Sequence, residues 1–580
     1  MAQCLVTTLS EAVENQDILA ADELVVTVNH INSSYPDSAR RLNISFRANA
    51  TVRMADSTYH FADANNVDLG PSIFFDAVTG KDLYCPNPPE GKSYKIIISN
   101  KYSISGLNTQ EYPSVQYNFF EFDLSDLRYC TFLASLRCMC HKITGGLEDL
   151  KRIETLEYLQ IGRTQITGDI ASLKNNPNLR HFKGSPSDVY GDIAVIKELP
   201  LLRSFEVSGC LEIYGDISAF ENHTSINSIT LPLIASHTAI HGDIAYLAGC
   251  TSLQVINAAN EWGVYGDISA LSDLSFLRII RLNSTRVHGN IGNLANNTLL
   301  EEIFFSNGIN ETFLGSASDK ITGDIASLSG LANLRIIHLQ YTGVTGDISD
   351  LINVPRLNTV YLTSTAVEGD IEAFSPEAMP NLTVLELGSC AGISGDVAAL
   401  AGHGSLTTLQ LAGTNVTGDL GEALEDCTTL TGLGFNDTKV SGDITKIYRG
   451  TGMQTAVANG CVNLSGDLSG LPAAFYFLSS TGRSGSKFSW SADDARPASS
   501  TIIAFDNVDL GDDVENMLIN QASCTPRATT TSWLHRRIAV LGDNISADSM
   551  SAACSEACAA LAQKGYQIYI NNVLVVDPAA

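Results

Sequence analysis

Aspartates recur at a near-constant spacing through the middle of the chain, each directly after a glycine. If successive repeats stack about 4.8 Å apart, these side chains form a ladder of carboxylates that could bind calcium. They would equally cap short helical turns, because an aspartate accepts backbone N–H bonds at a helix N-terminus. Asn290 fills the same position, and asparagine caps as well as aspartate does. We therefore favour capping, keep calcium as the alternative, and expect no other cofactor. Representative turn and cap residues are Gly168 and Asp169, Gly346 and Asp347, and Gly418 and Asp419.

A second set of residues with binding chemistry lies within short apolar segments of the form L-x-x-L-x-L, as at Leu334, Ile337 and Leu339. The last two apolar positions alternate as in a strand with one buried face, so the residues beside them should be exposed on a concave sheet. Exposed aromatic side chains among polar ones suit recognition of protein or sugar, although exposed strand positions also tolerate almost any residue. The candidate binding residues are Tyr158, His181, Arg281, Phe304, His338, Tyr361, Glu386 and Gln410, of which Phe304, His338 and Tyr361 are consecutive in one column.

Known catalytic motifs are absent from the sequence. It contains no G-x-S-x-G, H-E-x-x-H or Walker motif. A glycosidase-like pair of carboxylates stays open as an alternative, but the repeat gives the aspartates a capping role instead. The 13 cysteines are odd in number and scattered, which predicts reduced, buried thiols rather than a disulfide framework. The sequence thus predicts a protein that is not an enzyme, with no catalytic residues and no metal site.

The repeat determines where these residues lie. Its glycines recur mostly every 23 or 24 residues, and aliphatic residues three apart follow each aspartate, such as Ile348 and Leu351. That spacing places both on one side of a short helical turn, and the glycine most simply supplies a tight turn before it. One repeat alone cannot bury its apolar residues, but stacked repeats can. The sequence therefore predicts a solenoid with a parallel sheet on one face.

This pattern resembles the leucine-rich-repeat family, L-x-x-L-x-L-x-x-N followed by L-x-G-x-I, and is closest to the plant-type repeat. The resemblance covers about residues 130 to 480. It implies an α/β solenoid whose parallel sheet lies on the concave face. Where the family has its ladder asparagine this chain has Thr or Cys, which can bond backbone through a hydroxyl or, more weakly, a thiol. These residues are Thr164, Cys210, Thr285, Thr342, Thr365, Cys390, Thr414, Thr438 and Cys461.

Three domains are expected. Residues 1–125 lack the repeat and have alternating apolar runs, which predict an all-β, sandwich-like domain that attaches or caps the solenoid. Residues 126–480 form the solenoid of about 14 repeats, and an insertion in its longest step, after Gly289, could bind a partner. Residues 481–580 form a capping region, with helices in DNVDLGDDVENMLINQA and ADSMSAACSEACAALAQKG and a closing strand or hairpin in YQIYINNVLVV.

Composition narrows the classes of partner. The chain has 63 acidic and 35 basic residues, a net charge of −28, which disfavours nucleic acid and anionic membrane surfaces. No apolar stretch of about 20 residues predicts a membrane span. The first residues, MAQCLVTTLSEAVENQDILAADE, lack the basic region and apolar run of a Sec signal peptide. We expect export, if it occurs, to follow another route or the removal of a leader.

The segments IIAFDNVDLGDDV and LAQKGYQIYIN, after T-G-D-I-x-x-L repeats, carry a narrower resemblance. Together they are similar to leucine-rich-repeat proteins encoded by phages of gut Bacteroides-type bacteria, including crAss-like phages. This resemblance implies a virion protein, assembled in the host cytoplasm, that serves as a tail or head fibre or another receptor-facing part. Its partners would be other virion proteins and a host surface protein or glycan. A homo-oligomer is compatible with this role, although no coiled-coil heptad supports a trimer.

Two other classes of function stay open. A bacterial surface or secreted adhesin could carry the same repeat at the cell surface, but the sequence shows no export signal of the usual kind. A polysaccharide-degrading enzyme could use the solenoid as a scaffold, but no active-site motif accompanies the repeat. We therefore favour the virion protein over the adhesin, and both over the enzyme.

Overall fold

The computed structural model divides into two compact units, Met1–Val287 (unit 1) and His288–Ala580 (unit 2). The insertion after Gly289 lies mostly outside the described residues, at 307–319. The structure describes residues 24–29, 41–46, 50–54, 61–62, 68–70, 72–75, 80–84, 93–98, 104–109, 120–233, 239–306, 320–450, 453, 455–461, 463–480, 487–491, 497, 499–526, 537–546 and 548–577.

All described elements before residue 122 are strands, as predicted for an all-β N-terminal region. One sheet has the order β10-β1-β8-β3-β6, and beside it β2 pairs with β7 and β9 while β4 pairs with β5 and β7. Strand β9 also pairs in parallel with the first strand of the repeats, β11 (Ser135–Arg137), so the N-terminal strands run directly into the repeat sheet. The bounds are β1 (Leu24–Asn29), β2 (Arg41–Phe46), β3 (Ala50–Met54), β4 (Phe61–Ala62), β5 (Asp68–Gly70), β6 (Ser72–Phe75), β7 (Gly80–Tyr84), β8 (Ser93–Ile98), β9 (Ile104–Asn108) and β10 (Phe120–Glu121).

One coil of unit 2 shows how the repeat folds. Strand β26 (Ile336–His338) buries its central Ile337 and turns its other two side chains outward. A second strand, β27 (Gly343–Asp347), buries Val344, and the 3-10 helix η14 (Ile348–Asn353) then buries Ile348 and Leu351. Each coil thus contributes one row of aliphatic side chains, and stacked coils join these rows into a continuous core.

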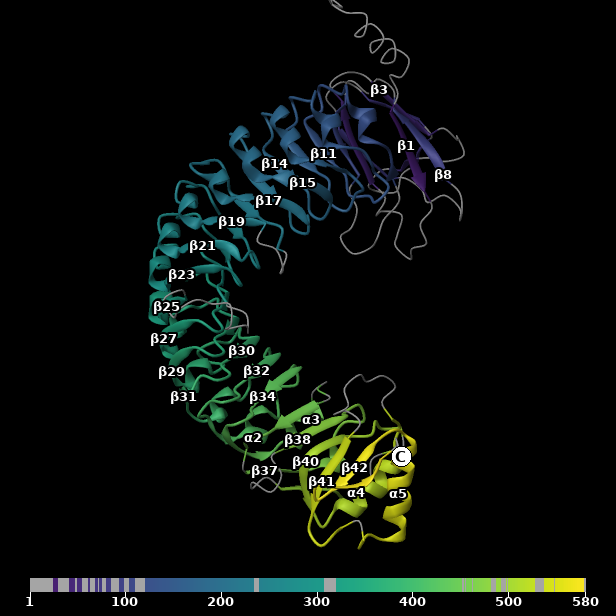
Figure 1. The fold of residues 1–580 in the computed structure, drawn as a ribbon, viewed down its shortest axis with the longest axis vertical. Coiled ribbons are helices and arrows are strands. Elements are labelled where there is room, and N and C mark those ends of the chain that lie inside the picture. Colours follow the sequence, from purple (N-terminus) through teal and green to yellow (C-terminus); the bar gives the residue numbers. More distant parts are fainter. Residues whose placement is uncertain are drawn as a thin grey trace, which may run out of the picture. The chain divides into compact units, whose positions relative to one another are not determined.

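Unit 1 stacks its coils through two parallel ladders and a row of 3-10 helices (Figure 1). The first ladder continues from β11 through β12 (Tyr158–Gln160), β14 (His181–Lys183), β16 (Ser204–Glu206), β18 (Ser228–Thr230), β20 (Val255–Asn257) and β22 (Ile279–Arg281). The second ladder is β13 (Thr167–Asp169), β15 (Asp188–Asp192), β17 (Glu212–Asp216), β19 (Ile240–Asp243) and β21 (Gly263–Asp267). The helices are η3 (Leu124–Leu127), η4 (Leu147–Leu150), η5 (Ile170–Asn175), η6 (Ile193–Glu198), η7 (Ile217–Phe220), η8 (Ile244–Leu247) and η9 (Ile268–Leu271).

Unit 2 repeats the arrangement. Its first ladder is β24 (Glu302–Phe304), β26, β28 (Thr359–Tyr361), β30 (Val384–Glu386), β32 (Thr408–Gln410) and β34 (Gly432–Gly434). Its second ladder is β23 (Arg286–Asn290), β25 (Ile321–Asp324), β27, β29 (Ala366–Asp370) and β31 (Gly392–Ser394), followed by the separate ladder β33 (Thr417–Asp419), β35 (Lys439–Asp443), β37 (Asn463–Asp467) and β39 (Lys487–Ser489). The helices are η10 (Ile291–Leu294), η13 (Ile325–Leu328), η14, η15 (Ile371–Phe374), η16 (Val397–Leu400), α2 (Leu420–Leu424), α3 (Thr445–Gly450) and η17 (Leu468–Gly470).

The glycine of each Gly-Asp pair lies in or beside a strand of the second ladder, which corrects the prediction of a tight turn. Gly168, Gly346 and Gly418 have φ angles of 118°, 104° and 102° within β13, β27 and β33. Glycine adopts these angles without the strain that a side chain would bring. A Cβ at Gly346 would also collide with the carboxylate of Asp324 in the preceding coil, so close packing requires the glycine as well.

The Thr and Cys residues that replace the ladder asparagine bond backbone oxygens, as predicted. The Thr342 hydroxyl donates to the carbonyl oxygen of Leu339, three residues earlier, over 2.6 Å. The Cys390 thiol instead donates to the carbonyl oxygen of Leu362 in the preceding coil over 3.1 Å. Threonine therefore fixes the turn of its own coil, whereas cysteine links two coils.

The C-terminal sheet corrects one predicted helix. Residues of DNVDLG lie in the strand β40 (Ala504–Gly511) rather than in the helix, which begins later as α4 (Val514–Ser523). Strand β40 pairs with β38 and β41 on its two sides, and these pairs satisfy backbone groups that a helix would otherwise bond internally. Where a closing strand or hairpin is expected, β42 and β43 form an antiparallel pair. The remaining bounds are β36 (Thr455–Ala458), β38 (Phe477–Ser480), β41 (Arg537–Gly542), α5 (Ala552–Gln563), β42 (Gln567–Ile570) and β43 (Val573–Val576).

Candidate binding surface

The first ladder of each unit presents two columns of side chains on its outward face. In every strand the central residue points into the core, so the first and third residues share the opposite face. All eight candidate residues occupy such positions and are half-buried. The structure places Tyr158, His181 and Arg281 in unit 1, and Phe304, His338, Tyr361, Glu386 and Gln410 in unit 2.

The unit 2 candidates lie in one column, at the third position of five successive strands. The register pairs Phe304 with His338, His338 with Tyr361, and Tyr361 with Glu386. The ring centroids of Phe304 and His338 are 4.2 Å apart with an interplanar angle of 18°, and those of His338 and Tyr361 are 4.0 Å apart at 32°. These distances are shorter than the strand spacing of about 4.8 Å, so the rings lean together into a stack. We call these five residues the ring stripe.

Burial shifts the pKa of two groups in the ring stripe. Burial raises the pKa of the Glu386 carboxyl. Burial, and after it the charge of Glu386, raises the pKa of the Tyr361 hydroxyl. The stripe thus combines an apolar ring stack with a carboxylate that is partly withdrawn from water.

An unpartnered acceptor lies beside the ring stripe. The Oε1 atom of Gln340, two residues beyond His338, is buried and has no hydrogen-bond partner among the described residues. A buried acceptor without a partner costs about 1–3 kcal/mol. Directly before β26, the Arg335 guanidinium pairs with the Glu302 carboxylate over 3.1 Å.

The unit 1 candidates are only partly brought together. Tyr158 and His181 are cross-strand neighbours with ring centroids 5.3 Å apart, and the Arg137 guanidinium lies 4.0 Å from the Tyr158 centroid. Burial, and then the charges of Lys183 and other cations, lowers the pKa of His181. Arg281 lies on β22, which is separated from His181 by β16, β18 and β20. The sequence therefore identified outward positions in unit 1 but not a single cluster.

The aspartates that follow the repeat glycines lie on the helical side of the coils, where their carboxylates accept hydrogen bonds from backbone amides. The Oδ1 atom of Asp347 accepts from the Ser349 amide over 2.8 Å, and Oδ1 of Asp370 accepts from the Glu372 amide over 2.9 Å. Asp169 and Asn290 make the same bond in their own coils. Asp419 bonds one residue further on, to the amide of Glu422, because an α-helix follows it.

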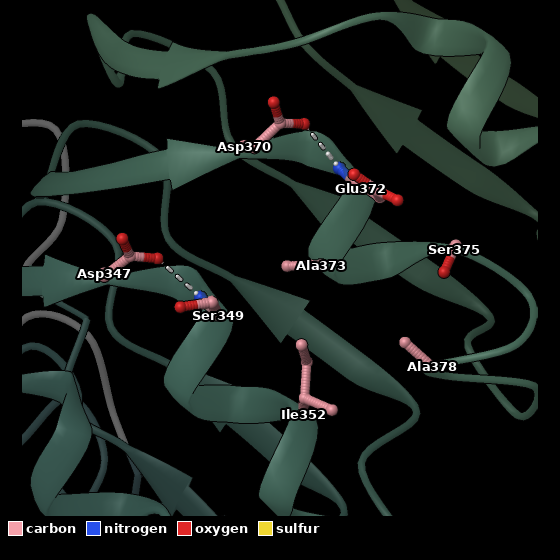
Figure 2. A pocket seen from close by; sticks show the side chains of 8 residues that line it. All are labelled: Asp347, Ser349, Ile352, Asp370, Glu372, Ala373, Ser375 and Ala378. Carbon is pink, nitrogen blue, oxygen red and sulfur yellow. Dashed lines mark hydrogen bonds between the residues drawn. The ribbon is translucent and has the colours of Figure 1, made fainter.

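Two neighbouring caps line an open pocket of about 410 Å³ in unit 2. Figure 2 shows the carboxylates of Asp347 and Asp370 on adjacent coils, each bonded to the amide at the start of its helix. Among the described residues, no three His, Cys, Asp or Glu side chains converge as metal ligands do. Calcium at the aspartate column stays a hypothesis. The pocket is lined by Asp347, Ser349, Ile352, Asp370, Glu372, Ala373, Ser375 and Ala378.

Sequence reasoning missed the outward residue that precedes each glycine in the second ladder. In four successive coils of unit 1 this position holds large rings, at Tyr190, Tyr214, His241 and Tyr265, whereas the earlier strand β13 has Thr167 there. In unit 2 it often holds a hydroxyl, and that of Thr345, for example, bonds the Gly323 carbonyl oxygen over 3.4 Å. The signal was present, because an aliphatic residue two positions before the glycine continues a period of two.

Comparisons with known proteins identify the fold. No protein-family model and no curated protein sequence matches the chain. Among solved structures, a TDR receptor is 17% identical over 72% of this chain and 70% of its own, with a TM-score of 0.54. The Arabidopsis receptor kinase HAESA, in complex with the peptide hormone IDA and the co-receptor SERK1, is 16% identical over 73% and 77%, with a TM-score of 0.48. A leucine-rich-repeat protein of Leptospira interrogans is 10% identical over 60% and 90%, with a TM-score of 0.40.

No helix within the described residues has both the length and the apolar character needed to cross a lipid bilayer. The regular coils, the parallel ladders and the likeness to the TDR receptor agree on one architecture. The fold of this chain is a leucine-rich-repeat solenoid preceded by all-β structure.

Proposed function

We propose that this chain is a non-enzymatic binding protein that holds a protein partner on the ring stripe of unit 2. The observation that carries the proposal is the stack of Phe304, His338 and Tyr361, which continues into Glu386 along one column. Aromatic side chains concentrate binding energy at protein interfaces, particularly beside polar groups that fix the orientation of a partner.

A protein partner fits the stripe better than a glycan does. A sugar ring packs against the open face of an aromatic ring, whereas the His338 ring at the centre of the stripe has neighbouring rings on both sides. A polypeptide can instead place side chains along the ring edges and donate hydrogen bonds to Glu386. The raised pKa of Glu386 reflects the burial that would strengthen such a bond.

The biological setting that we propose is a phage particle, in which the chain is a fibre or another receptor-facing component. This setting is supported by the similarity of the repeats and of the two C-terminal segments to proteins of crAss-like phages. Its partners would be a host surface protein and neighbouring virion proteins, and its location the virion. An adhesin on a bacterial surface is the alternative setting for the same binding face.

The setting is tested by mass spectrometry of purified particles of the phage that carries the gene. Peptides of this chain should be recovered at a stoichiometry similar to that of other structural proteins. Recovery from the host envelope fraction, with none in the particles, would favour the adhesin. Release of sugars from host polysaccharide by the purified chain would overturn the non-enzymatic assignment.

The binding face is tested with Tyr361→Ala, in which the end of the stack is removed. We expect binding to host cells or to isolated virion proteins to weaken by about thirtyfold, because loss of an aromatic interface anchor costs about 2 kcal/mol. Thr359→Ala, at the other outward position of the same strand, is the matched control and should change binding less than threefold. Tyr361→Phe keeps the stack and should retain most of the affinity. Equal loss in Tyr361→Ala and Thr359→Ala, with unchanged circular dichroism, would contradict the proposal.

A further inference from the structure

A second surface, in unit 1, exposes large rings on four successive coils. Tyr190, Tyr214 and Tyr265 directly precede glycines of the second ladder and are 43%, 51% and 42% exposed. His241 occupies the same position on β19, between the coils of Tyr214 and Tyr265. We call these four residues the tyrosine flank. Exposed aromatic side chains gain no stability from burial in this chain, so a row of them indicates a contact surface.

Carboxylates border the tyrosine flank on both sides. Asp188 and Asp192 lie two residues before and after Tyr190, and residues two apart in a strand share a face. Glu212 and Asp216 border Tyr214 in the same way, and Glu212 is also the cross-strand partner of Tyr190. The strands β13, β15, β17, β19 and β21 contain no lysine or arginine.

The bordering carboxylates differ in their contacts within the described part of unit 1. Asp192 and Asp216 cap the helices that follow them. Asp188 and Glu212 instead cap nothing and form no ion pair among the described residues. They therefore stand as free negative charges next to exposed ring faces.

The flank already accepts a cation at one end. The Arg286 guanidinium lies over the Tyr265 ring, 5.4 Å from its centroid, and its Nε donates to the carbonyl oxygen of Trp262 over 3.1 Å. In the described part of unit 1, no cation covers Tyr190 or Tyr214. Among the described residues, Tyr190 and Tyr214 therefore lack the cation that Arg286 supplies to Tyr265.

We propose that the tyrosine flank binds an arginine-bearing segment of a partner protein at Tyr190 and Tyr214. A guanidinium is planar, stacks on aromatic faces and donates in pairs to carboxylates, so it uses both features of the surface at once. A neutral glycan could stack on the rings but would not neutralise the charges of Asp188 and Glu212. A nucleic acid would be repelled by the carboxylates. The proposal is independent of the ring stripe, which lies on the first ladder of unit 2.

Fluorescence anisotropy with a labelled oligoarginine peptide tests the proposal. At about 0.15 M salt long-range attraction is screened, so contact at the flank should dominate. The double variant Tyr190→Leu/Tyr214→Leu should bind oligoarginine about fivefold to thirtyfold more weakly, because it loses two exposed cation–π contacts. Oligolysine should bind the unmodified chain more weakly than oligoarginine, since ammonium groups cannot stack or bond in pairs.

Matched variants separate the flank from the general acidity of the chain. Tyr190→Phe/Tyr214→Phe keeps both ring faces and should bind within about twofold of the unmodified chain. Tyr246→Leu removes a similarly exposed tyrosine, 40% accessible, from the helical row of unit 1 and should have no effect. Asp188→Asn/Glu212→Gln should weaken binding more than Glu154→Gln/Glu198→Gln, which removes the same charge from exposed sites elsewhere in unit 1.

The outcomes are distinct. A loss in Tyr190→Leu/Tyr214→Leu no larger than in Tyr246→Leu overturns the proposal, as does equal binding of oligoarginine and oligolysine. Binding of a neutral oligosaccharide that the leucine variant abolishes, with oligoarginine binding unchanged, would assign the surface to glycan and also overturn it. Unchanged thermal unfolding of the leucine and phenylalanine variants shows that the comparison is made between folded chains.

Discussion

At the scale of single residues, the sequence predicted which side chains share the ring stripe but not how they meet. Phe304, His338 and Tyr361 occupy the same repeat position, so their common column follows from the period of the repeat alone. The tilt that brings the rings to 4.2 and 4.0 Å follows from packing of the side chains against one another. The partial burial of Glu386 depends likewise on neighbours in adjacent coils.

Glu386→Gln tests whether that burial has an energetic cost. Burial raises the pKa of Glu386 in the folded chain, so the charged carboxylate opposes folding at pH values above this raised pKa. The amide variant should therefore be more stable to denaturant at neutral pH. The difference should shrink as the pH falls from the raised folded pKa through the ordinary glutamate value of about 4.3, because both states of the parent chain are then protonated.

Gln410→Glu is the opposite control, since it adds a carboxylate to the next position of the same column. It should destabilise the chain at neutral pH and match the parent under acidic conditions. Denaturant midpoints measured from neutral to acidic pH report both effects. A constant difference between Glu386→Gln and the parent chain at every pH would mean that ionisation of Glu386 is not responsible.

At the scale of elements, the sequence predicted the first strand and the helical return of each coil but assigned the glycine between them to a turn. The aliphatic residue two positions before the glycine, such as Val344, continues a strand of period two. Glycine normally weakens a strand, so a glycine at this position does not by itself indicate a strand. The need for glycine at this position follows from the stacking of coils, because the carboxylate of the preceding coil lies close to Gly346.

Gly346→Ala should therefore destabilise unit 2 by about 1–3 kcal/mol, from backbone strain at positive φ and the clash with Asp324. Gly330→Ala is the matched control, because no atom lies within 4 Å of the position that its Cβ would take. That variant should be neutral or slightly more stable than the parent chain. Denaturant unfolding compares the two, and equal stabilities would mean that the glycine column is not required for stacking.

At the scale of the whole molecule, the fold class was accessible from sequence because one short unit is repeated many times. The regions outside the regular repeat were less accessible, and the error at Asp506–Gly511 shows why. This segment has polar residues that suit a helix start, but it pairs on both sides with strands distant in sequence. Such long-range pairing leaves a weaker local signal than the repeat does.

The cysteines provide a measurement that covers both units. All 11 described cysteines are buried, and burial raises the pKa of the Cys250 thiol to about 11. We therefore expect these 11 thiols to react slowly with a thiol reagent in the folded chain, whereas Cys4 and Cys85 lie outside the described residues. Denaturant should expose all 13 thiols. Rapid labelling of Cys210 or Cys461 in the native chain, read by mass spectrometry, would contradict the packed core of unit 1 or unit 2 respectively.

The residue before each glycine has a further consequence. Rings occupy this position in four coils of unit 1, where Tyr214 is half exposed, and hydroxyls such as that of Thr345 occupy it in several coils of unit 2. The aspartate cap and the aliphatic core are the same in both cases. One site per coil can therefore vary freely while its neighbours maintain the architecture. Recognition on this side of the protein can evolve one coil at a time, through single substitutions that leave folding intact.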